Sequence, residues 1–318
     1  MPNRPFLLDC DTGIDDAMAI IYLLGEPDID LVGITNVFGN VDPDQAAANT
    51  LALLELAGRP DIPVAIGAHH PLHGRYDGGA PHVHGHNGIG GITLPSPAAE
   101  PSTEAAAQMI VRLAHEHRGQ LHIVATGPLT NIALALALDP AFPHHIASLT
   151  IMGGAAAVPG NVSPVAEANI GNDPEAAVAV LSAHWPHLTL VPLDVTMTQQ
   201  LTEADRQVLL ASPRPVPQAI GRMLDFYFDF YEGLLGTRSC ALHDPLAAAI
   251  ATGRAATQLA PRVHIEIDAT PGPGRGQTIC DLRWRHLDYP EQRDANANLV
   301  LELAGPFAAA LMERLLNS

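Results

Sequence analysis

A dense group of carboxylates near the N-terminus constrains the fold more than any other feature of the sequence. Four aspartates stand within eight positions, namely Asp9, Asp11, Asp15 and Asp16. They follow the apolar run 6–8 and precede residues 17–24, which read as a helix, so they occupy a strand-to-helix turn. Asp9 and Asp11 are two residues apart on an extended segment and should point the same way, and Gly13 frees the backbone to turn. Carboxylates held this close repel one another unless a proton or a hard divalent cation lies among them.

The same aspartates also admit a simpler interpretation. Asp15 or Asp16 would be a helix N-cap with a neighbour favoured by the helix dipole, and Asp9 would be a turn residue. We favour the metal interpretation because a buried group of carboxylates is costly without a partner. Both interpretations remain open from these residues alone.

Strand-like and helix-like segments alternate after this turn. The β-branched run 31–37 and the run 63–67 read as strands, and residues 44–57 between them read as a helix. This order predicts an α/β fold, with a largely parallel central sheet covered by helices on both faces. Ligands of such sheets gather beyond the carboxyl ends of the strands, where the aspartates and Asn40 lie. No linker divides the chain, so we expect a single domain over residues 1–318.

The rest of the chain continues the alternation. We expect further strands at 121–125, 148–152, 188–193, 263–267 and 282–284. We expect further helices at 102–117, 132–138, 203–211 and 217–235, and a last one ending near 316. Ser102 or Thr103 is a suitable N-cap for the first of these helices. Tyr227 and Tyr231 are one helical turn apart and share a face, which is more typical of a core than of a ligand site.

Composition excludes several classes of function. The formal charge of −18 disfavours a nucleic-acid polymer or an anionic membrane as partner, because both favour basic surfaces. All 16 Lys and Arg positions are Arg, which excludes Schiff-base chemistry and a phosphate-binding lysine. Three cysteines far apart in sequence indicate a reducing compartment. No apolar run is long enough to span a bilayer and the first residues lack a signal-peptide pattern, so we expect a cytoplasmic protein.

Two long irregular segments carry polar side chains suited to ligands. Residues 68–98 are rich in Gly, Pro and His, and a loop of that length is usually functional or disordered. The alternating His82, His84 and His86 leave a transition-metal site open as an alternative. Residues 158–175 are non-helical in pattern and rich in amides, which suits hydrogen bonding to a polyhydroxylated ligand.

Several separated motifs stand in an order that is typical of one enzyme family. They are Asp-Cys-Asp-Thr-Gly-Ile-Asp-Asp-Ala at 9–17, Thr-Gly-Pro-Leu-Thr-Asn at 126–131, Gly-Asn-Val-Ser-Pro-Val-Ala-Glu-Ala-Asn at 160–169 and His-Asp-Pro-Leu-Ala at 243–247. Together they resemble the inosine-uridine preferring nucleoside hydrolases, with Thr12 where Pro is common. The resemblance implies a nucleoside hydrolase-like fold with a Rossmann-like core. It also implies an enzyme of nucleoside salvage that cleaves the N-glycosidic bond of free ribonucleosides to give ribose and a nucleobase.

The resemblance further implies a role for each matching residue. Ca²⁺ would be bound by Asp11, Asp16, the carbonyl of Thr126 and Asp244. Asp11 would act as general base on a water held by the ion, and His243 would help the departing base to accept a proton. The substrate contacts would come from Asp15, Asn40, His84, Met152, Asn161, Glu167 and Asn169, with Tyr227 and Tyr231 near the base. Members of this family are commonly dimers or tetramers, so we expect a homodimer or a homotetramer.

Two other functions fit part of the sequence. Asp9 and Asp11 at a strand end are typical of aspartate-nucleophile phosphatases, but Gly13 replaces their Thr or Val and no lysine is present to hold phosphate. A non-catalytic nucleoside sensor would keep the metal site but would need neither Asp11 nor His243. The preferred base, whether hypoxanthine, uracil or cytosine, does not follow from these residues.

Overall fold

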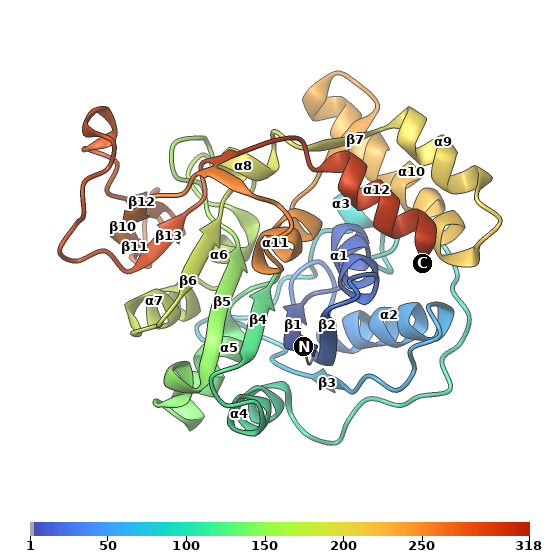
Figure 1. The fold of residues 1–318 in the computed structure, drawn as a ribbon, viewed down its shortest axis with the longest axis horizontal. Coiled ribbons are helices and arrows are strands. Elements are labelled where there is room, and N and C mark those ends of the chain that lie inside the picture. Colours follow the sequence, from blue (N-terminus) through green and yellow to red (C-terminus); the bar gives the residue numbers. More distant parts are fainter. Residues whose placement is uncertain (1–2) are drawn as a thin grey trace.

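The computed structural model describes residues 3–318 and is built on an eight-stranded sheet (Figure 1). The strands lie in the order β10-β13-β6-β5-β4-β1-β2-β3. Their bounds are β1 Arg4–Cys10, β2 Ile29–Asn36, β3 Val64–Ile66, β4 Leu121–Ala125, β5 Ile146–Met152, β6 Leu188–Val191, β10 Arg262–Val263 and β13 Ala297–Leu299. Neighbouring strands run parallel, except that β10 is antiparallel to β13. The predicted α/β fold with a largely parallel sheet is confirmed.

Helices cover both faces of the sheet because its central strands are apolar on both sides. Phe6 and Leu8 of β1 belong to one hydrophobic core, whereas Leu7 between them belongs to a second. The first core includes residues of α1 (Ile14–Leu24), α2 (Pro43–Leu56) and α11 (Asp244–Ala251). The second includes residues of α4 (Ala106–Glu116), α5 (Thr130–Leu138) and α7 (Pro174–Ser182). The alternation along β1 therefore buries each side chain under one helical layer or the other.

Three more helices extend the first core away from the sheet (Figure 1). They are α9 (Glu203–Ala211), α10 (Pro215–Leu235) and α12 (Ala308–Asn317). The short strands β7 (Gln200–Thr202) and β8 (Ser239–Ala241) pair antiparallel and connect this layer to α11. The helix α10 also contacts α1 and the short helix α3 (Pro81–His84), so it lies next to the predicted aspartate site.

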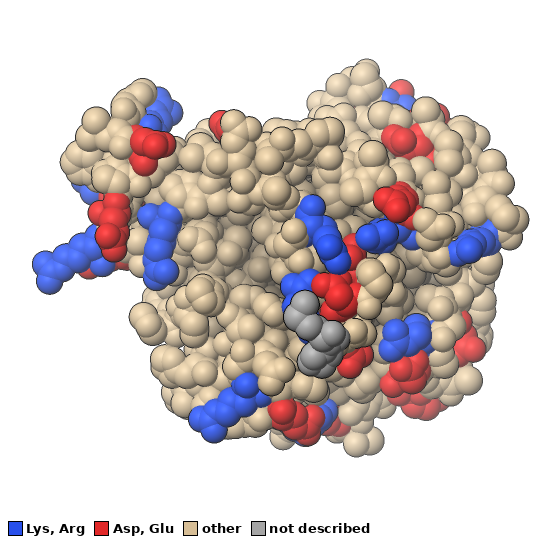
Figure 2. Space-filling model, in the orientation of Figure 1, with Lys and Arg blue, Asp and Glu red and all other residues tan. Residues whose placement is uncertain are grey.

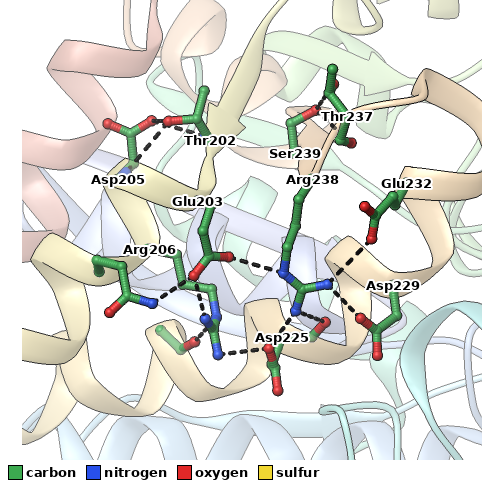
Figure 3. Close-up of polar contacts among 12 residues, drawn as sticks. Thr202, Glu203, Asp205, Arg206, Asp225, Asp229, Glu232, Thr237, Arg238 and Ser239 are labelled. Atoms are coloured by element: carbon green, nitrogen blue, oxygen red, sulfur yellow. Dashed lines mark hydrogen bonds and ion pairs between the residues drawn. The ribbon is translucent and has the colours of Figure 1, made fainter.

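An ion-pair network fixes the outer side of α10 (Figure 3). Arg238 lies 3.1 Å from a carboxylate of α9 and 2.5 Å from two carboxylates of α10. Arg206 of α9 lies 2.7 Å from one of the latter. The carboxylates of the network are Glu203, Asp225, Asp229 and Glu232. Tyr227 and Tyr231 of the same helix are buried, so the network holds the helix from outside while the tyrosines face inward.

The segment between β10 and β13 forms an arm at one end of the molecule (Figures 1 and 2). It contains β11 (Ile265–Ile267), β12 (Thr278–Cys280) and the 3₁₀ helix η2 (Arg285–Leu287). The predicted strand 263–267 is divided between β10 and β11, and the predicted strand at 282–284 is wrong. Asp281 instead accepts hydrogen bonds from the Arg283 guanidinium at 2.8 Å, which folds this segment locally.

Other elements lie within a few residues of their predicted bounds, with local exceptions. Neither Ser102 nor Thr103 caps α4, whose N-cap is Ala105. The Ser102 N–H donates instead to the carbonyl of Val64 at 2.7 Å, because β3 is an edge strand with free acceptors. The predicted strand 188–193 ends at Val191, before the short helix α8 (Leu193–Thr196). The irregular segment 158–175 contains the short helix α6 (Ala168–Asn172), and β9 (Thr257–Leu259) pairs with β14 (Glu302–Leu303).

Across residues 3–318, no helix combines the length and the apolar character that crossing a membrane requires. Figure 2 shows Arg side chains close to Asp and Glu side chains on the face drawn. The strongly acidic net charge therefore coexists with local ion pairs.

Candidate active site

Residues from distant parts of the chain meet at the carboxyl ends of the central strands. Asp11 follows β1, Asn40 follows β2 and Thr126 follows β4, and these three strands are neighbours in the sheet. Asp244 is the first residue of α11, which packs against α1. The parallel sheet and the contact between the two helices thus bring Asp244 to the N-terminal aspartates.

Asp15, Asp16 and Asp244 form a triad at this place. One carboxylate oxygen of each lies within 4.8 Å of those of the other two. All three residues are buried, with exposed fractions of 5%, 0% and 3%. The Oδ1 atom of Asp15 has no hydrogen-bond partner. A buried, unpartnered carboxylate oxygen beside two other carboxylates fits a cation with hard oxygen ligands.

Asp11 lies beside the triad without being a member of it. The Asn40 N–H donates to Asp11 Oδ2 at 2.7 Å, and Asn40 Nδ2 lies 3.3 Å from both Asp11 Oδ1 and Asp16 Oδ2. Gly39 permits this approach, because a Cβ atom there would lie 1.9 Å from Asp11 Oδ2. The structure therefore places Asn40 between Asp11 and Asp16, and it brings Asp15 into the group of possible metal ligands.

The carboxyl groups share a buried and mutually repulsive environment. Burial raises the pKa of Asp11 well above its ordinary value, and the Asp16 carboxylate adds to this effect. Burial raises the pKa of Asp16 to about 6, and the neighbouring carboxylate of Asp15 contributes to this increase. The pKa of Asp244 is also raised well above its ordinary value by burial and then by the neighbouring carboxylates. A cation among these oxygens would relieve both causes.

Asp9 does not join the other aspartates, contrary to expectation. Its Oδ1 atom accepts hydrogen bonds from Thr35 Oγ1 at 2.6 Å and from Asn131 Nδ2 at 2.8 Å. The strand β1 ends at Cys10, so the alternation of a strand no longer fixes the direction of Asp11. Burial raises the pKa of Asp9 to about 7. Asp9 thus joins β1 to β2 and α5 rather than extending the triad.

Gly13 is required for space rather than for backbone freedom. It is the N-cap of α1, with a φ of −92° that any residue adopts. A Cβ atom at this position would lie 2.6 Å from Asn40 Nδ2 and 2.7 Å from His84 Nδ1. The helix begins directly afterwards at Ile14, so Asp15 and Asp16 lie in its first turn, at the opening of the helix as expected.

Thr126 and Asn169 lie on the other side of the triad. Thr126 Oγ1 donates to Asp16 Oδ1 at 2.8 Å. Asn169 Nδ2 donates to the carbonyl oxygens of Thr126 at 2.9 Å and of Met152 at 3.1 Å. Since a carbonyl oxygen has two lone pairs, that of Thr126 retains one for a cation. Asn169 and Met152 therefore adjoin the atom that was predicted to bind the metal.

The remaining residues predicted for the sugar differ in their surroundings. Glu167 is buried, and its two oxygens accept backbone N–H groups of Gly154, Asn169 and Ile170 at 2.8–3.1 Å. Burial raises the pKa of Glu167. Asn161 is exposed, and its Oδ1 atom accepts the N–H of Ala168 at 2.9 Å. Within residues 3–318, no hydrogen bond joins Asn161 to the triad, so its predicted contact with ribose remains a prediction.

His84 borders the triad from α3. Its Nδ1 atom accepts the N–H of Ile14 at 3.1 Å and lies 3.9 Å from Asp15 Oδ1. Burial lowers the pKa of His84 to about 4, so the imidazole is neutral at pH 7 and carries its proton on Nε2. Its ring lies 5.2 Å from that of Tyr227. The structure thus places the predicted base-binding histidine between the aspartates and α10.

Three side chains form a hydrogen-bonded line beside Asp244. His243 Nε2 lies 2.6 Å from the Tyr231 hydroxyl, and His243 Nδ1 lies 2.8 Å from Thr196 Oγ1. All three residues are buried. Burial lowers the pKa of His243, which favours a neutral ring that donates through one nitrogen and accepts through the other. Tyr231 therefore contacts the predicted acid directly, and Tyr227 packs against Tyr231 with 4.9 Å between ring centroids.

Sequence reasoning missed Thr196 and the role of Asn131. Thr196 ends the short helix α8, and only the fold brings it to His243. Asn131 lies within a motif that was recognised, yet its contact with Asp9 left no separate sequence signal. The transition-metal alternative at His82, His84 and His86 is not supported, because no group of three possible metal ligands in residues 3–318 contains any of them.

Comparison with known proteins decides the family. Residues 6–307 match the family described as inosine-uridine preferring nucleoside hydrolase. The chain belongs to this family. It is 39% identical over 281 residues to a probable uridine nucleosidase 2 of Arabidopsis thaliana, a match covering 87% of this chain and 85% of that protein. It is 41% identical over 246 residues to a pyrimidine-specific ribonucleoside hydrolase of Citrobacter koseri, covering 77% and 78% of the two chains.

A solved nucleoside hydrolase has the same fold. The purine-preferring ribonucleoside hydrolase of Gardnerella vaginalis aligns with a TM-score of 0.90 and 32% identity, over 99% of this chain and 98% of that chain. As a member of the nucleoside hydrolase family, the chain is a ribonucleoside hydrolase, which is an N-glycosyl hydrolase. The predicted family, fold and enzyme class are confirmed.

Proposed function

We propose that this nucleoside hydrolase depends on Ca²⁺ and prefers pyrimidine ribonucleosides, with uridine as the best substrate. The buried triad of Asp15, Asp16 and Asp244, with its unpartnered Asp15 Oδ1, is the observation that supports a bound ion. Asp11 and the Thr126 carbonyl adjoin the triad and complete a set of oxygen ligands. Ligands that are all oxygen favour Ca²⁺ over Zn²⁺ or Cu²⁺. When bound, the ion would offset the carboxylate repulsion, acidify a water molecule and anchor ribose hydroxyls.

Asp11 is the general base in this proposal. Asn40 holds both oxygens of its carboxylate, through its N–H at 2.7 Å and its Nδ2 at 3.3 Å. This orientation keeps the base fixed while it takes a proton from the attacking water. Glycosidic cleavage passes through an oxocarbenium-like transition state, and the surrounding carboxylates stabilise the positive charge that develops on the sugar.

The ribose subsite is formed by the side chains around the triad. Asn169 and Glu167 lie on the side of Met152, whereas Asp15 and Asn40 lie on the side of α1. Glu167 already accepts three backbone N–H groups, which leaves one of its four lone-pair positions for a hydroxyl. The exposed Asn161 would reach the sugar from the irregular segment that precedes α6.

The leaving base is bound and protonated on the side of α10. The Nε2–H of His84 is a donor suited to a carbonyl oxygen of a pyrimidine. A proton taken up by His243 can pass to the base through the Tyr231 hydroxyl, which gives its own proton to the base and takes one from His243 Nε2, while Thr196 holds the ring at Nδ1. His243 and Tyr231 thus supply the proton that the departing base requires.

Replacing His243 with Ala tests whether this residue supplies the proton that the departing base requires. Uridine hydrolysis is expected to fall about 10²-fold or more, because its base departs poorly without a proton. Hydrolysis of p-nitrophenyl riboside is expected to change little, since nitrophenolate needs no proton to leave. The measurement is kcat for both substrates. Tyr231→Phe, which keeps the ring, should show the same pattern more weakly, and equal losses on both substrates would contradict the role of His243.

A panel of ribonucleosides tests the proposed substrate and ion together. We expect kcat/KM to be highest for uridine, then cytidine, with inosine, adenosine and guanosine slower. Relatives named a probable uridine nucleosidase and a pyrimidine-specific ribonucleoside hydrolase support the preference for pyrimidines. Each assay is repeated with a chelator and after adding back Ca²⁺ or Mg²⁺. Faster cleavage of inosine would overturn the base preference, and equal rescue by Mg²⁺ would overturn the choice of ion.

Binding of uridine without release of uracil would favour the sensor alternative over catalysis. We also propose a homodimer or homotetramer of single-domain chains, and light scattering of the purified protein tests this expectation.

A further inference from the structure

A second group of possible metal ligands lies at the amino edge of the sheet, opposite the active site. His115 stands in the last turn of α4, Asp139 directly follows α5, and His145 is the last residue of the 3₁₀ helix η1 (Phe142–His145) before β5. One ligand atom of each lies within 4.8 Å of those of the other two. The active site lies at the carboxyl ends of the same parallel strands, so the two groups are separated by the length of the sheet.

His145 is the residue that points to a ligand. It is 8% exposed, and its Nδ1 atom has no hydrogen-bond partner. Its ring lies 4.6 Å from that of His115. A buried imidazole nitrogen without a partner is unfavourable unless a ligand occupies it.

The other two side chains combine a fixed carboxylate with an adaptable imidazole. Asp139 Oδ2 lies 2.8 Å from His115 Nε2, and Asp139 Oδ1 accepts the N–H of Ala141 at 2.9 Å. The carbonyl of His145 accepts the N–H of Gly119 at 2.7 Å. Asp139 and His145 are therefore held by the backbone, whereas the side chain of His115 is 48% exposed and free to adjust.

We propose that His115, Asp139 and His145 bind one divalent transition-metal ion such as Zn²⁺, independently of the active site. Two imidazoles and one carboxylate suit such an ion, in contrast to the all-oxygen triad. Tetrahedral ligands about 2.0 Å from Zn²⁺ stand roughly 3.3 Å apart. The observed separations, from 2.8 Å to at most 4.8 Å, bracket this value. A small movement of the exposed His115 closes the site, and water takes the fourth position.

The ion would connect three separate elements. His115 ends α4, Asp139 ends α5 and His145 begins the approach to β5. A ligand that binds the native state and not the unfolded chain raises the stability of the native state. We therefore expect Zn²⁺ to raise the unfolding temperature through this site, whatever ion occupies the aspartate triad.

Zinc titration of the full-length protein and matched variants tests the proposal. Equilibrium dialysis against Zn²⁺ alone measures the ions bound per chain, and thermal unfolding is recorded in parallel. In His115→Ala, the affinity of one site should fall at least about tenfold, and the Zn²⁺-dependent rise in unfolding temperature should disappear. Asp139→Asn should have the same effect. His144→Ala, which removes an exposed histidine next to the site, should bind like the wild type.

Differences in Zn²⁺ binding between these variants cannot come from the aspartate triad, because every variant keeps the triad unchanged. Equal Zn²⁺ affinity and stoichiometry in wild type, His115→Ala and Asp139→Asn would overturn the proposal. An equal loss in His144→Ala would also overturn it, because binding would then come from surface histidines in general.

Discussion

Replacing Asp11 with Asn is expected to lower kcat for ribonucleosides by about 10²–10⁴-fold. Asn keeps the shape of the side chain and can still contact Asn40, but it cannot take a proton from water. Asp11 is buried, and its two contacts with Asn40 hold its carboxylate in one orientation. The measurement is steady-state release of uracil from uridine, with unfolding temperature recorded to verify the fold.

Two controls make this prediction specific. Asp30→Asn changes an exposed aspartate of β2 and should leave kcat unchanged. Ca²⁺ affinity of Asp11→Asn should be measured as well, because Asp11 is also a proposed ligand. A rate near that of the wild type at saturating Ca²⁺ would eliminate Asp11 as the base. A rate restored only by more Ca²⁺ would assign it to metal binding alone.

Removing the divalent ion should abolish activity and also change how stability depends on pH. In the metal-free protein, burial raises the pKa of Asp16 to about 6 and that of Asp9 to about 7, from an ordinary 3.8. The native state therefore binds more protons than the unfolded chain between about pH 4 and about pH 7. Stability should fall as the pH rises through this window. For Asp16 alone the raised pKa corresponds to roughly 3 kcal/mol.

Adding Ca²⁺ should weaken or reverse this pH dependence. A bound cation favours the ionised carboxylates, so it stabilises the protein more at about pH 8 than at about pH 5. Thermal unfolding at both pH values, with chelator and with Ca²⁺, measures the effect. Asp244→Asn removes one carboxylate from the triad, and its metal-free form should lose less stability between the two pH values. Metal-free protein that is equally stable at both pH values would contradict the raised pKa values of Asp16 and Asp9.

Local sequence patterns were sufficient for the strands and helices that build the site. The apolar run before Asp9 became β1, and Leu121–Ala125 and Glu203–Ala211 have the predicted bounds. These segments are decided by apolar periodicity and capping, which neighbouring residues supply. The arm was less predictable, because the residues after β12 fold locally around the contacts between Asp281 and Arg283 and do not continue as a strand.

The possible site residues could also be identified from motifs, but the hydrogen-bond partners of these residues could not. The aspartates, Asn169 and His243 could be named from short strings of residues. Their partners could not, since Thr196 reaches His243 across 47 positions and Asn131 reaches Asp9 across 122. Contacts of that separation are set by strand order and helix packing rather than by local sequence.

Short motifs and apolar periodicity were thus sufficient to predict the family, the α/β class and the carboxylate-rich turn, because each single motif or segment depends on residues close together in the chain. The association of Asp15 with Asp16 and Asp244, and the hydrogen bonds of Asp9 to Thr35 and Asn131, became visible only in the folded chain. The groups that contact a carboxylate depend on which strand ends and helix ends the fold brings next to it. At the candidate active site, the packing of α11 against α1 brings Asp244 to Asp15 and Asp16.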